Sequence, residues 1–242
     1  MPALVGTAGW AIGKSAADSF PETGSSLERY AAIFPVVEIN SSFHRAHRLS
    51  TWQRWRDTVP RDFRFSVKLP KTISHERKLV DCDDLLELFL DQVRELGDKL
   101  GVLLLQLPPK LEFHEKNAER FLANLISKCP APTVCEPRHA SWFEPQADAL
   151  LNGMRVARVG ADPARHPGAG YPGGWRGLSY FRWHGSPAVY RSSYADRIPK
   201  LAEDVRREAA EGGDVWCIFD NTASSAASAD GLMLMKALAS NT

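Results

Sequence analysis

Charged and polar side chains stand at the ends of eight short apolar runs in this 242-residue chain. In the stretch VCEPRHASWF, at residues 134–143, an apolar run leads into Glu136, Arg138 and His139. A second run carries Glu38, and a third ends in Asp220. Carboxylates and imidazoles can transfer protons, and a guanidinium binds phosphate or developing negative charge. These residue types therefore predict acid–base chemistry on an anionic group.

The spacing of the polar residues indicates that many of them share one face of a sheet. Residues two apart on a strand point to the same side, as Glu136 and Arg138 do, whereas His139 has the opposite parity. The side chains predicted to face a common interior are Glu38, Asn40, Gln106, Glu136, Arg138, Arg182, His184 and Asp220. Burying so many polar groups is costly unless they pair or meet a ligand.

We predict a catalytic set and a larger substrate-binding set from these positions. Glu38 or Glu136 would be the general base or acid, His184 or His139 the proton shuttle, and Asp220 completes the catalytic set. Because arginines flank Glu136, we expect it to stay ionised and to suit a base better than an acid. The predicted substrate-binding residues are Trp10, Asn40, Lys68, Gln106, Arg138, His139, Trp142, Arg182, Tyr190 and Asn221.

Two other interpretations of the same residues stay open. In a purely structural network, Glu136 would pair with Arg182 and Asp220 with Arg138. The candidate ligands of a metal would be Glu136, Asp162 and His184. Nearby arginines would repel a cation, so a divalent metal is the less favoured hypothesis. We find no motif for an organic cofactor, because GTAGWAIGK at residues 6–14 does not fit a GxGxxG fingerprint.

Eight predicted strands alternate with helical segments and must position these side chains. The predicted strands are Leu4–Trp10, Val36–Phe43, Arg64–Pro70, Val102–Pro108, Thr133–His139, Arg155–Asp162, Leu178–Gly185 and Val215–Asn221. Predicted helices occupy residues 25–34, 49–59, 83–101, 117–128, 145–153, 198–213 and 228–240. Residues 163–177 are rich in Gly and Pro and are predicted to form a long loop.

This alternation predicts an α/β fold, a single (β/α)₈ TIM barrel over residues 1–242 with a closed, parallel eight-stranded sheet and outer helices. An open doubly wound sheet is the alternative. Ser25 and Glu28 have capping-box spacing, Ser50 is the predicted N-cap of the second helix, and Gly101 is predicted to close the third. In such a barrel the site lies where the strands end, at the C-terminal face.

Composition limits the partners of the protein. Hydrophobic residues make up 44% and charged residues 24%, which is typical of a globular chain, and no run is long enough to span a membrane. The net charge of +1 provides no global attraction to nucleic acid, so an anionic partner would need a local basic patch. Basic residues predicted around the barrel mouth are Arg45, Arg48, Lys71, Arg77, Arg138, Arg182 and Arg191.

The cysteines and the N-terminus predict a cytoplasmic protein. Cys82, Cys129, Cys135 and Cys217 include no CxxC pair, and two of them lie in apolar runs, as expected in a reducing compartment. The first ten residues have neither a basic segment nor a long apolar one, so we expect no signal peptide.

Motifs along the whole chain resemble the domain-of-unknown-function 72 family, also called YecE-like. They are GTAGW, VVEINSSFHR, FRFSVKLPKTISHE, LLLQLPPKL, EPRHASWF, FRWHG, YRSSY and IFDNTASSAASADG. The resemblance implies a TIM barrel but no particular reaction. His44 stands where the family usually has Tyr, and Asp220 where it usually has Asn.

The favoured function is an enzyme that acts on a phosphorylated or nucleotide-containing substrate by acid–base chemistry. Arg138, Arg182 and Lys68 would bind the phosphate or the developing charge. One alternative is a non-catalytic protein that binds nucleic acid or a nucleotide, and another is a metal-dependent barrel resembling endonucleases or isomerases. The anionic partner, small molecule or nucleic acid, and the oligomeric state stay open.

Overall fold

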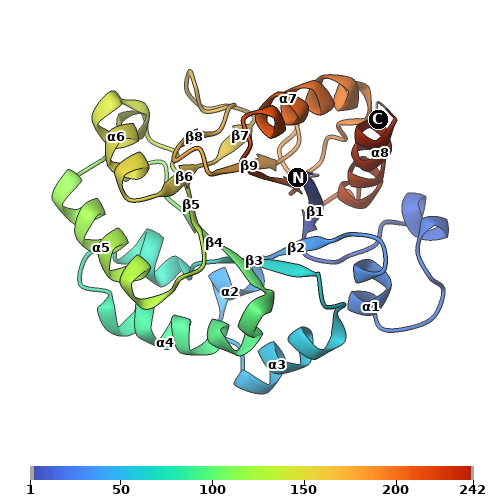
Figure 1. The fold of residues 1–242 in the computed structure, drawn as a ribbon, viewed down its shortest axis with the longest axis horizontal. Coiled ribbons are helices and arrows are strands. Elements are labelled where there is room, and N and C mark those ends of the chain that lie inside the picture. Colours follow the sequence, from blue (N-terminus) through green and yellow to red (C-terminus); the bar gives the residue numbers. More distant parts are fainter. Residues whose placement is uncertain (1–2, 241–242) are drawn as a thin grey trace.

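The computed structural model describes residues 3–240, in which ten strands curl into a nearly closed barrel with helices around it (Figure 1). The sheet order is β7-β9-β10-β1-β2-β3-β4-β5-β6-β8. The strands are β1 (Leu4–Ala8), β2 (Val36–Ile39), β3 (Arg64–Lys68), β4 (Leu100–Gln106), β5 (Thr133–Glu136), β6 (Val156–Arg158), β7 (Gly160–Asp162), β8 (Gly173–Gly174), β9 (Leu178–Trp183) and β10 (Asp214–Phe219). All neighbouring pairs are parallel except β6 with β8.

The predicted sixth strand, Arg155–Asp162, is divided between the two ends of this sheet. β6 pairs with β5, whereas β7 pairs with β9, and only Val159 separates them. The long loop supplies partners at the break: Ala161 N donates to Ala169 O at 2.7 Å, and β8 pairs antiparallel with β6. A mixed ten-stranded sheet therefore replaces the expected all-parallel sheet of eight strands, although the barrel shape is as predicted.

The helices around the outside occupy the predicted segments (Figure 1). They are α1 (Ser26–Ala31), α3 (Leu49–Thr58), α4 (Asp83–Val93), α5 (Glu115–Lys128), α6 (Pro145–Gly153), α7 (Ile198–Ala210) and α8 (Ala227–Ala239). The short helix α2 (Ser41–His44) instead occupies the end of the predicted second strand, which stops at Ile39. The capping box of Ser25 and Glu28 is confirmed by reciprocal hydrogen bonds of 3.3 and 2.7 Å. Ser50 is not an N-cap, because α3 begins one residue earlier and Arg48 precedes it.

The third predicted helix ends earlier than expected. Gly97 has a φ of 56°, outside the helical region, and residues Arg94–Lys99 form a 3₁₀ segment that leads directly into β4. Gly101 lies in β4, where an added Cβ would be 2.7 Å from the Trp216 ring. Its role is thus to admit an indole into the barrel rather than to close a helix.

Along each strand, apolar side chains fill the barrel interior first, and polar residues occupy the interior near the C-terminal ends of the strands. The interior core contains Val36, Leu104, Val134, Tyr180 and Trp216. A larger core packs the outer face of the sheet against the helices. The two clusters separate by strand parity, as the two faces of a closed sheet require.

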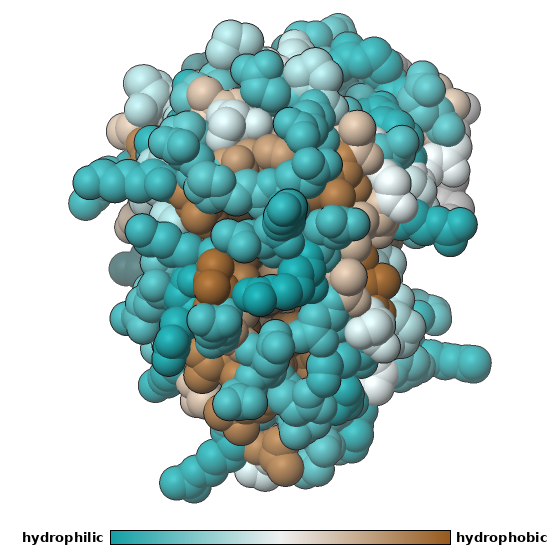
Figure 2. Space-filling model, turned by 90° about the vertical axis from the view of Figure 1, so that its left-hand side faces the viewer, coloured by the Kyte–Doolittle hydropathy of each residue, from teal (hydrophilic) through white to brown (hydrophobic). Residues whose placement is uncertain are grey.

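The outer surface is mostly hydrophilic over the side that Figure 2 presents, with apolar residues in scattered patches. Within residues 3–240, no helix combines the length and apolarity needed to cross a membrane. Cys82, Cys129, Cys135 and Cys217 are buried and unpaired.

Candidate functional site

Arg182 lies fully buried near the C-terminal end of β9 and contacts three carboxylates. Its Nε and Nη2 donate to Glu38 at 2.9 and 2.7 Å, and Nη2 also donates to Asp220 Oδ2 at 2.9 Å. Nη1 donates to Glu136. Burial alone would lower the pKa of Arg182, but the three carboxylates raise it well above its ordinary value. Arg182 is therefore a fixed positive charge inside the barrel.

His184 joins two of the same carboxylates. Its Nδ1 lies 2.9 Å from Asp220 Oδ2, and its Nε2 lies 3.1 Å from Glu136 Oε1. Burial disfavours the imidazolium, but these carboxylates raise the pKa of His184 overall. Burial likewise favours protonated carboxyls, yet Arg182 and His184 hold the pKa values of Glu136 and Asp220 below their ordinary range. We call Glu38, Glu136, Arg182, His184 and Asp220 the mouth cluster.

The structural pairing predicted from the sequence is half confirmed. Glu136 does pair with Arg182. The predicted pair of Asp220 with Arg138 is wrong, because Asp220 contacts Arg182 and His184 instead. Arg138 donates twice to Glu136 Oε1, at 3.2 and 3.0 Å.

Two members of the surrounding hydrogen-bond network were missed from the sequence. Tyr180 donates its hydroxyl to Glu38 Oε2 at 2.9 Å and lies 2.8 Å from Ser66 Oγ. Both have the interior parity, Tyr180 two residues before Arg182 and Ser66 two before Lys68, so alternation could have found them. The predicted Gln106 is in place and donates to Glu136 Oε2 at 3.0 Å.

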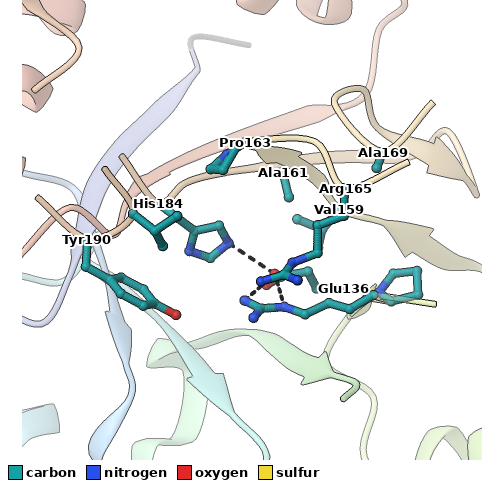
Figure 3. Close-up of a pocket in the computed structure, with 11 residues that line it drawn as sticks. Glu136, Val159, Ala161, Pro163, Arg165, Ala169, His184 and Tyr190 are labelled. Atoms are coloured by element: carbon teal, nitrogen blue, oxygen red, sulfur yellow. Dashed lines mark hydrogen bonds and ion pairs between the residues drawn. The ribbon is translucent and has the colours of Figure 1, made fainter. Parts of the chain in front are cut away.

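A pocket of about 210 Å³ opens beside the mouth cluster (Figure 3). It is lined by Glu136, Pro137, Arg138, Val159, Ala161, Pro163, Arg165, Ala169, His184, Val189 and Tyr190. Val159 lies between β6 and β7, and the other residues come from β5 and β7 and from the loops that follow β5, β7 and β9. The split sixth strand thus provides part of the pocket wall.

Cationic groups and a phenol converge on this pocket. Burial lowers the pKa of Arg138, but Glu136 and the adjacent Tyr190 hydroxyl raise it overall. Figure 3 shows the side chains of Arg165 and Tyr190 directed inward, towards Glu136. Arg165 is exposed and has no hydrogen bond or ion pair within residues 3–240. Its role was missed because the loop after Asp162 has no regular periodicity.

Lys68 ends β3 on the other side of the mouth. It is 8% exposed, and its Nζ lies 4.1 Å from the centroid of the Phe43 ring. Burial lowers the pKa of Lys68 to about 8, and the charge of Arg182 lowers it too, while the three cluster carboxylates act in the opposite direction. Over the described part of the chain, its ammonium has no hydrogen-bond or ion-pair partner.

Two predicted substrate-binding residues instead have structural positions. Trp142 is 1% exposed and donates its Nε1 to Leu111 O at 3.0 Å, so it packs in the core and cannot stack on a ligand. His139 precedes the 3₁₀ turn Ala140–Phe143 and accepts from Ser141 N at 3.3 Å. Neither residue lines the pocket.

The remaining predicted binding residues are Trp10, Asn221 and Asn40, of which Asn221 is fully buried. Trp10 packs edge-on against Trp55, with ring centroids 5.2 Å apart. Asn221 donates to Asp230 Oδ2 at 2.6 Å and to Ser192 O at 3.0 Å. In both asparagines, Asn40 and Asn221, the side-chain Oδ1 is buried without a partner in residues 3–240.

The three candidate metal ligands do not lie together. Asp162 forms a bidentate ion pair with Arg197, at 2.9 and 2.8 Å, whereas Glu136 and His184 belong to the mouth cluster. Across residues 3–240, no three His, Cys, Asp or Glu side chains are grouped as a metal site would require. Arg182 occupies the space between the carboxylates, so a cation bound to all of them would have to displace it.

The sequence profile described as "Protein of unknown function DUF72" matches residues 4–242. The chain belongs to the DUF72 family. It is 42% identical over 84 residues to the UPF0759 protein YecE of Escherichia coli strain K12, an alignment that covers 35% of this chain and 31% of YecE. It is 26% identical over 147 residues to the UPF0759 protein YunF of Bacillus subtilis strain 168, covering 58% of this chain and 52% of YunF. The matched part of the chain thus spans about a third of the length of YecE and about half of the length of YunF.

Solved DUF72 structures share the fold. A DUF72 protein from Thermotoga maritima superposes with a TM-score of 0.79 at 24% identity, covering 99% of this chain and all of that one. Another, from Enterococcus faecalis, has a TM-score of 0.80 at 22% identity and covers 99% of this chain and 96% of its own. Both likenesses support a TIM-like barrel.

Proposed function

We propose that this DUF72 protein is an enzyme that binds a phosphorylated small molecule in the 210 Å³ pocket and acts on it by proton transfer. The observation that carries the proposal is the convergence of Arg138, Arg165 and Tyr190 on a pocket whose wall holds the Glu136–His184 pair. Guanidinium groups with free N–H donors suit the oxygens of a phosphate. The volume favours a small phosphorylated molecule, or the phosphate end of a nucleotide, over a duplex.

The protonation states divide the acid–base roles. Glu136 and Asp220 raise the pKa of His184 and so favour its imidazolium form, which makes it the group that can donate a proton. Glu136 stays a carboxylate and accepts five hydrogen bonds from four residues, which makes it a weak base. Glu136 would hold the His184 imidazolium in place. It would also accept a proton from the bound substrate, after the nearby arginines have made that proton more acidic. Lys68, Asn40 and Gln106 complete the proposed binding surface.

Binding without catalysis, to a nucleotide or nucleic acid, is the alternative that the exposed arginines of the rim support. Arg45, Arg48, Arg77 and Arg191 are all exposed. The net charge of +1 argues against tight nonspecific binding of a duplex. The unpaired buried cysteines support a cytoplasmic location, where disulfides are rare.

Calorimetric titration with inorganic phosphate and with ribose 5-phosphate tests the anion site, with ribose as the uncharged comparison. We expect both anions to bind and Arg165→Ala to weaken them by about 10-fold, the value of one charge-assisted hydrogen bond. Arg165 makes no internal bond, so its removal should leave the fold intact. Arg61→Ala is the matched control, because Arg61 is exposed and precedes β3 at the opposite end of the barrel.

Catalysis is tested by following a panel of sugar phosphates by NMR in D₂O. We expect native protein, but not His184→Gln, to convert one member or to exchange its protons. Binding without conversion, together with steep salt dependence towards a single-stranded oligonucleotide, would favour the binding protein. If neither phosphate nor ribose 5-phosphate binds, the proposal fails.

A further inference from the structure

The amino group of Lys68 differs from the other cations of the mouth. Arg182 and Arg138 are held by carboxylates at hydrogen-bond distance, whereas Lys68 Nζ has no such partner within residues 3–240. It is nevertheless 8% exposed, at the C-terminal end of a barrel strand. Its nitrogen lies over the face of the Phe43 ring, 4.1 Å from the centroid, a cation–π contact that is weaker than an ion pair. A buried amine that is not held in an ion pair can lose its proton and act as a nucleophile.

Neighbouring groups extend this amine into a subsite. The β2–β3 register ends at the pair Ile39–Val67, so Asn40 and Lys68 each follow the last paired residue of two neighbouring strands, and Asn40 is the N-cap of α2. Asn40 Oδ1 is buried and has no partner in the described residues, so an acceptor is left for a ligand. His75 packs edge-on against Phe43, with ring centroids 4.9 Å apart, and Lys68 Nζ lies over the same ring. Burial and the charges of Lys68 and Arg138 lower the pKa of His75. Lys68 and His75 therefore border the same aromatic ring at the barrel mouth.

We propose that Lys68 is a carbonyl-reactive amine that forms an imine with an aldehyde or ketone group of the substrate. This inference deepens the proposed function, because the phosphate of the same substrate would be held by Arg138 and Arg165. The substrate class is then a small phosphorylated carbonyl compound.

The covalent step is balanced without an oxidant or a further reactant. The lone pair of neutral Lys68 Nζ forms a bond to the carbonyl carbon as the C=O π bond breaks, and one nitrogen proton passes to the oxygen to give a neutral carbinolamine. A second proton, taken from solvent, reaches the hydroxyl group. The C–O bond then breaks, the oxygen leaves as water, and a protonated imine remains. Asn40 Oδ1 can accept a hydrogen bond from the carbinolamine, and His75 can relay the proton. Glu38, Glu136 and Asp220 stabilise the iminium charge.

Proton affinity supports this role. With its pKa lowered to about 8, Lys68 has about 200 times the neutral-amine fraction at pH 7 of an ordinary lysine, whose pKa is about 10.4. This is the form that attacks a carbonyl.

Reductive trapping tests the proposal. The protein is incubated with glycolaldehyde phosphate and sodium cyanoborohydride, and the labelled lysines are identified by peptide mass spectrometry. We expect Lys68 to be labelled at least 10-fold faster at pH 7 than the exposed Lys116 on α5, with a pH midpoint near 8. Inorganic phosphate should slow the reaction.

Variants make the result specific to the amine. Lys68→Met and Lys68→Arg should abolish the fast labelling, and Lys116→Met should leave it unchanged. Circular dichroism checks that each variant is folded. The proposal is overturned if folded native protein labels Lys68 no faster than Lys116.

The two proposals fail separately in this experiment. If glycolaldehyde labels Lys68 as fast as glycolaldehyde phosphate does, Lys68 is reactive, but the pocket does not bind the phosphate and the proposed anion site is wrong. If calorimetry detects phosphate binding but Lys68 is not labelled, the anion site stands and the amine role falls.

Discussion

At the residue scale, the site is a set of charges whose partners determine what each can do. Arg182 has three carboxylate partners and is fixed as a cation, whereas Lys68 has no partner within hydrogen-bond distance among residues 3–240 and can release its proton. Strand alternation predicted that Arg182 faces the interior, whereas Lys68 was placed only on its strand, as a residue that binds phosphate or developing charge. The pair of Arg182 with Glu136 was an open alternative, but the pair of Arg182 with Glu38, 144 residues away in sequence, was not predicted.

Removal of Arg182 should strongly destabilise the fold. Arg182→Met would leave Glu38, Glu136 and Asp220 buried beside one another, so we expect the free energy of unfolding to fall by about 3–5 kcal/mol. Urea denaturation measures this. Arg120→Met is the control, because the Arg120–Asp81 pair is exposed and contributes at most about 1 kcal/mol. Similar losses in both variants would contradict a special role of Arg182.

Removal of Lys68 should have the opposite effect on stability. A lysine whose pKa is lowered to about 8 on folding resists the burial of its charge, so Lys68→Met should stabilise the protein at pH 7 by about 1–3 kcal/mol. The gain should shrink as the pH rises from 8 towards 10.4, since the native amine is then neutral. Urea midpoints at pH 7 and pH 10 measure both effects. A loss of stability at pH 7 would mean that the ammonium is favourably bound.

At the element scale, the sixth strand determines how the barrel closes. Its apolar pattern predicted one strand, yet β6 and β7 pair with different neighbours. The Gly-Pro-rich loop makes this possible by placing β8 against β6. Trp142 and His139, which were predicted to contact a ligand, lie beyond β5 and have structural contacts instead. Alternation specifies direction only within a strand, so it could not orient side chains beyond Glu136.

The β6–β8 contact depends on Gly174. Its φ is 62°, and an added Cβ would lie 2.7 Å from Val156 O, so Gly174→Val should break the pairing at a cost of about 1–3 kcal/mol. The amide of Trp175 donates to Val156 O at 3.0 Å, and its hydrogen exchange should accelerate. Gly153→Ala is the control, because its Cβ would meet nothing within 4 Å. Unchanged exchange in Gly174→Val would refute this account of β8.

At the scale of the whole molecule, the mouth cluster makes the stability of the protein depend on pH in both directions, because its stabilising contribution is lost at high pH and at low pH. The pKa of His184 is raised on folding, so its contribution is complete below about pH 6.5 and is lost as the pH rises through the folded-state value. The pKa values of Glu136 and Asp220 are lowered, so their contributions are present above about pH 4 and are lost as the pH falls.

We therefore expect the cluster to stabilise the protein most between about pH 5 and pH 6.5. Free energies of unfolding from urea titrations between pH 3 and pH 9 measure the profile. The His184→Gln variant isolates the contribution of His184. The difference in free energy of unfolding between this variant and the native protein should decrease above pH 6.5. A difference that does not vary with pH would mean that His184 is not protonated in the native cluster.

The sequence by itself determined the alternation of strands and helices, the barrel architecture and the inward-facing polar residues. These follow from periodicity along the chain, which is local. Only the tertiary structure decided that the sixth strand divides, that Arg182 gathers three carboxylates and that Arg165 and Tyr190 reach the same pocket as Arg138. Each of these depends on contacts between segments far apart in sequence. The pKa of a buried charged group and the path of a loop are determined by the residues that they contact in the folded protein.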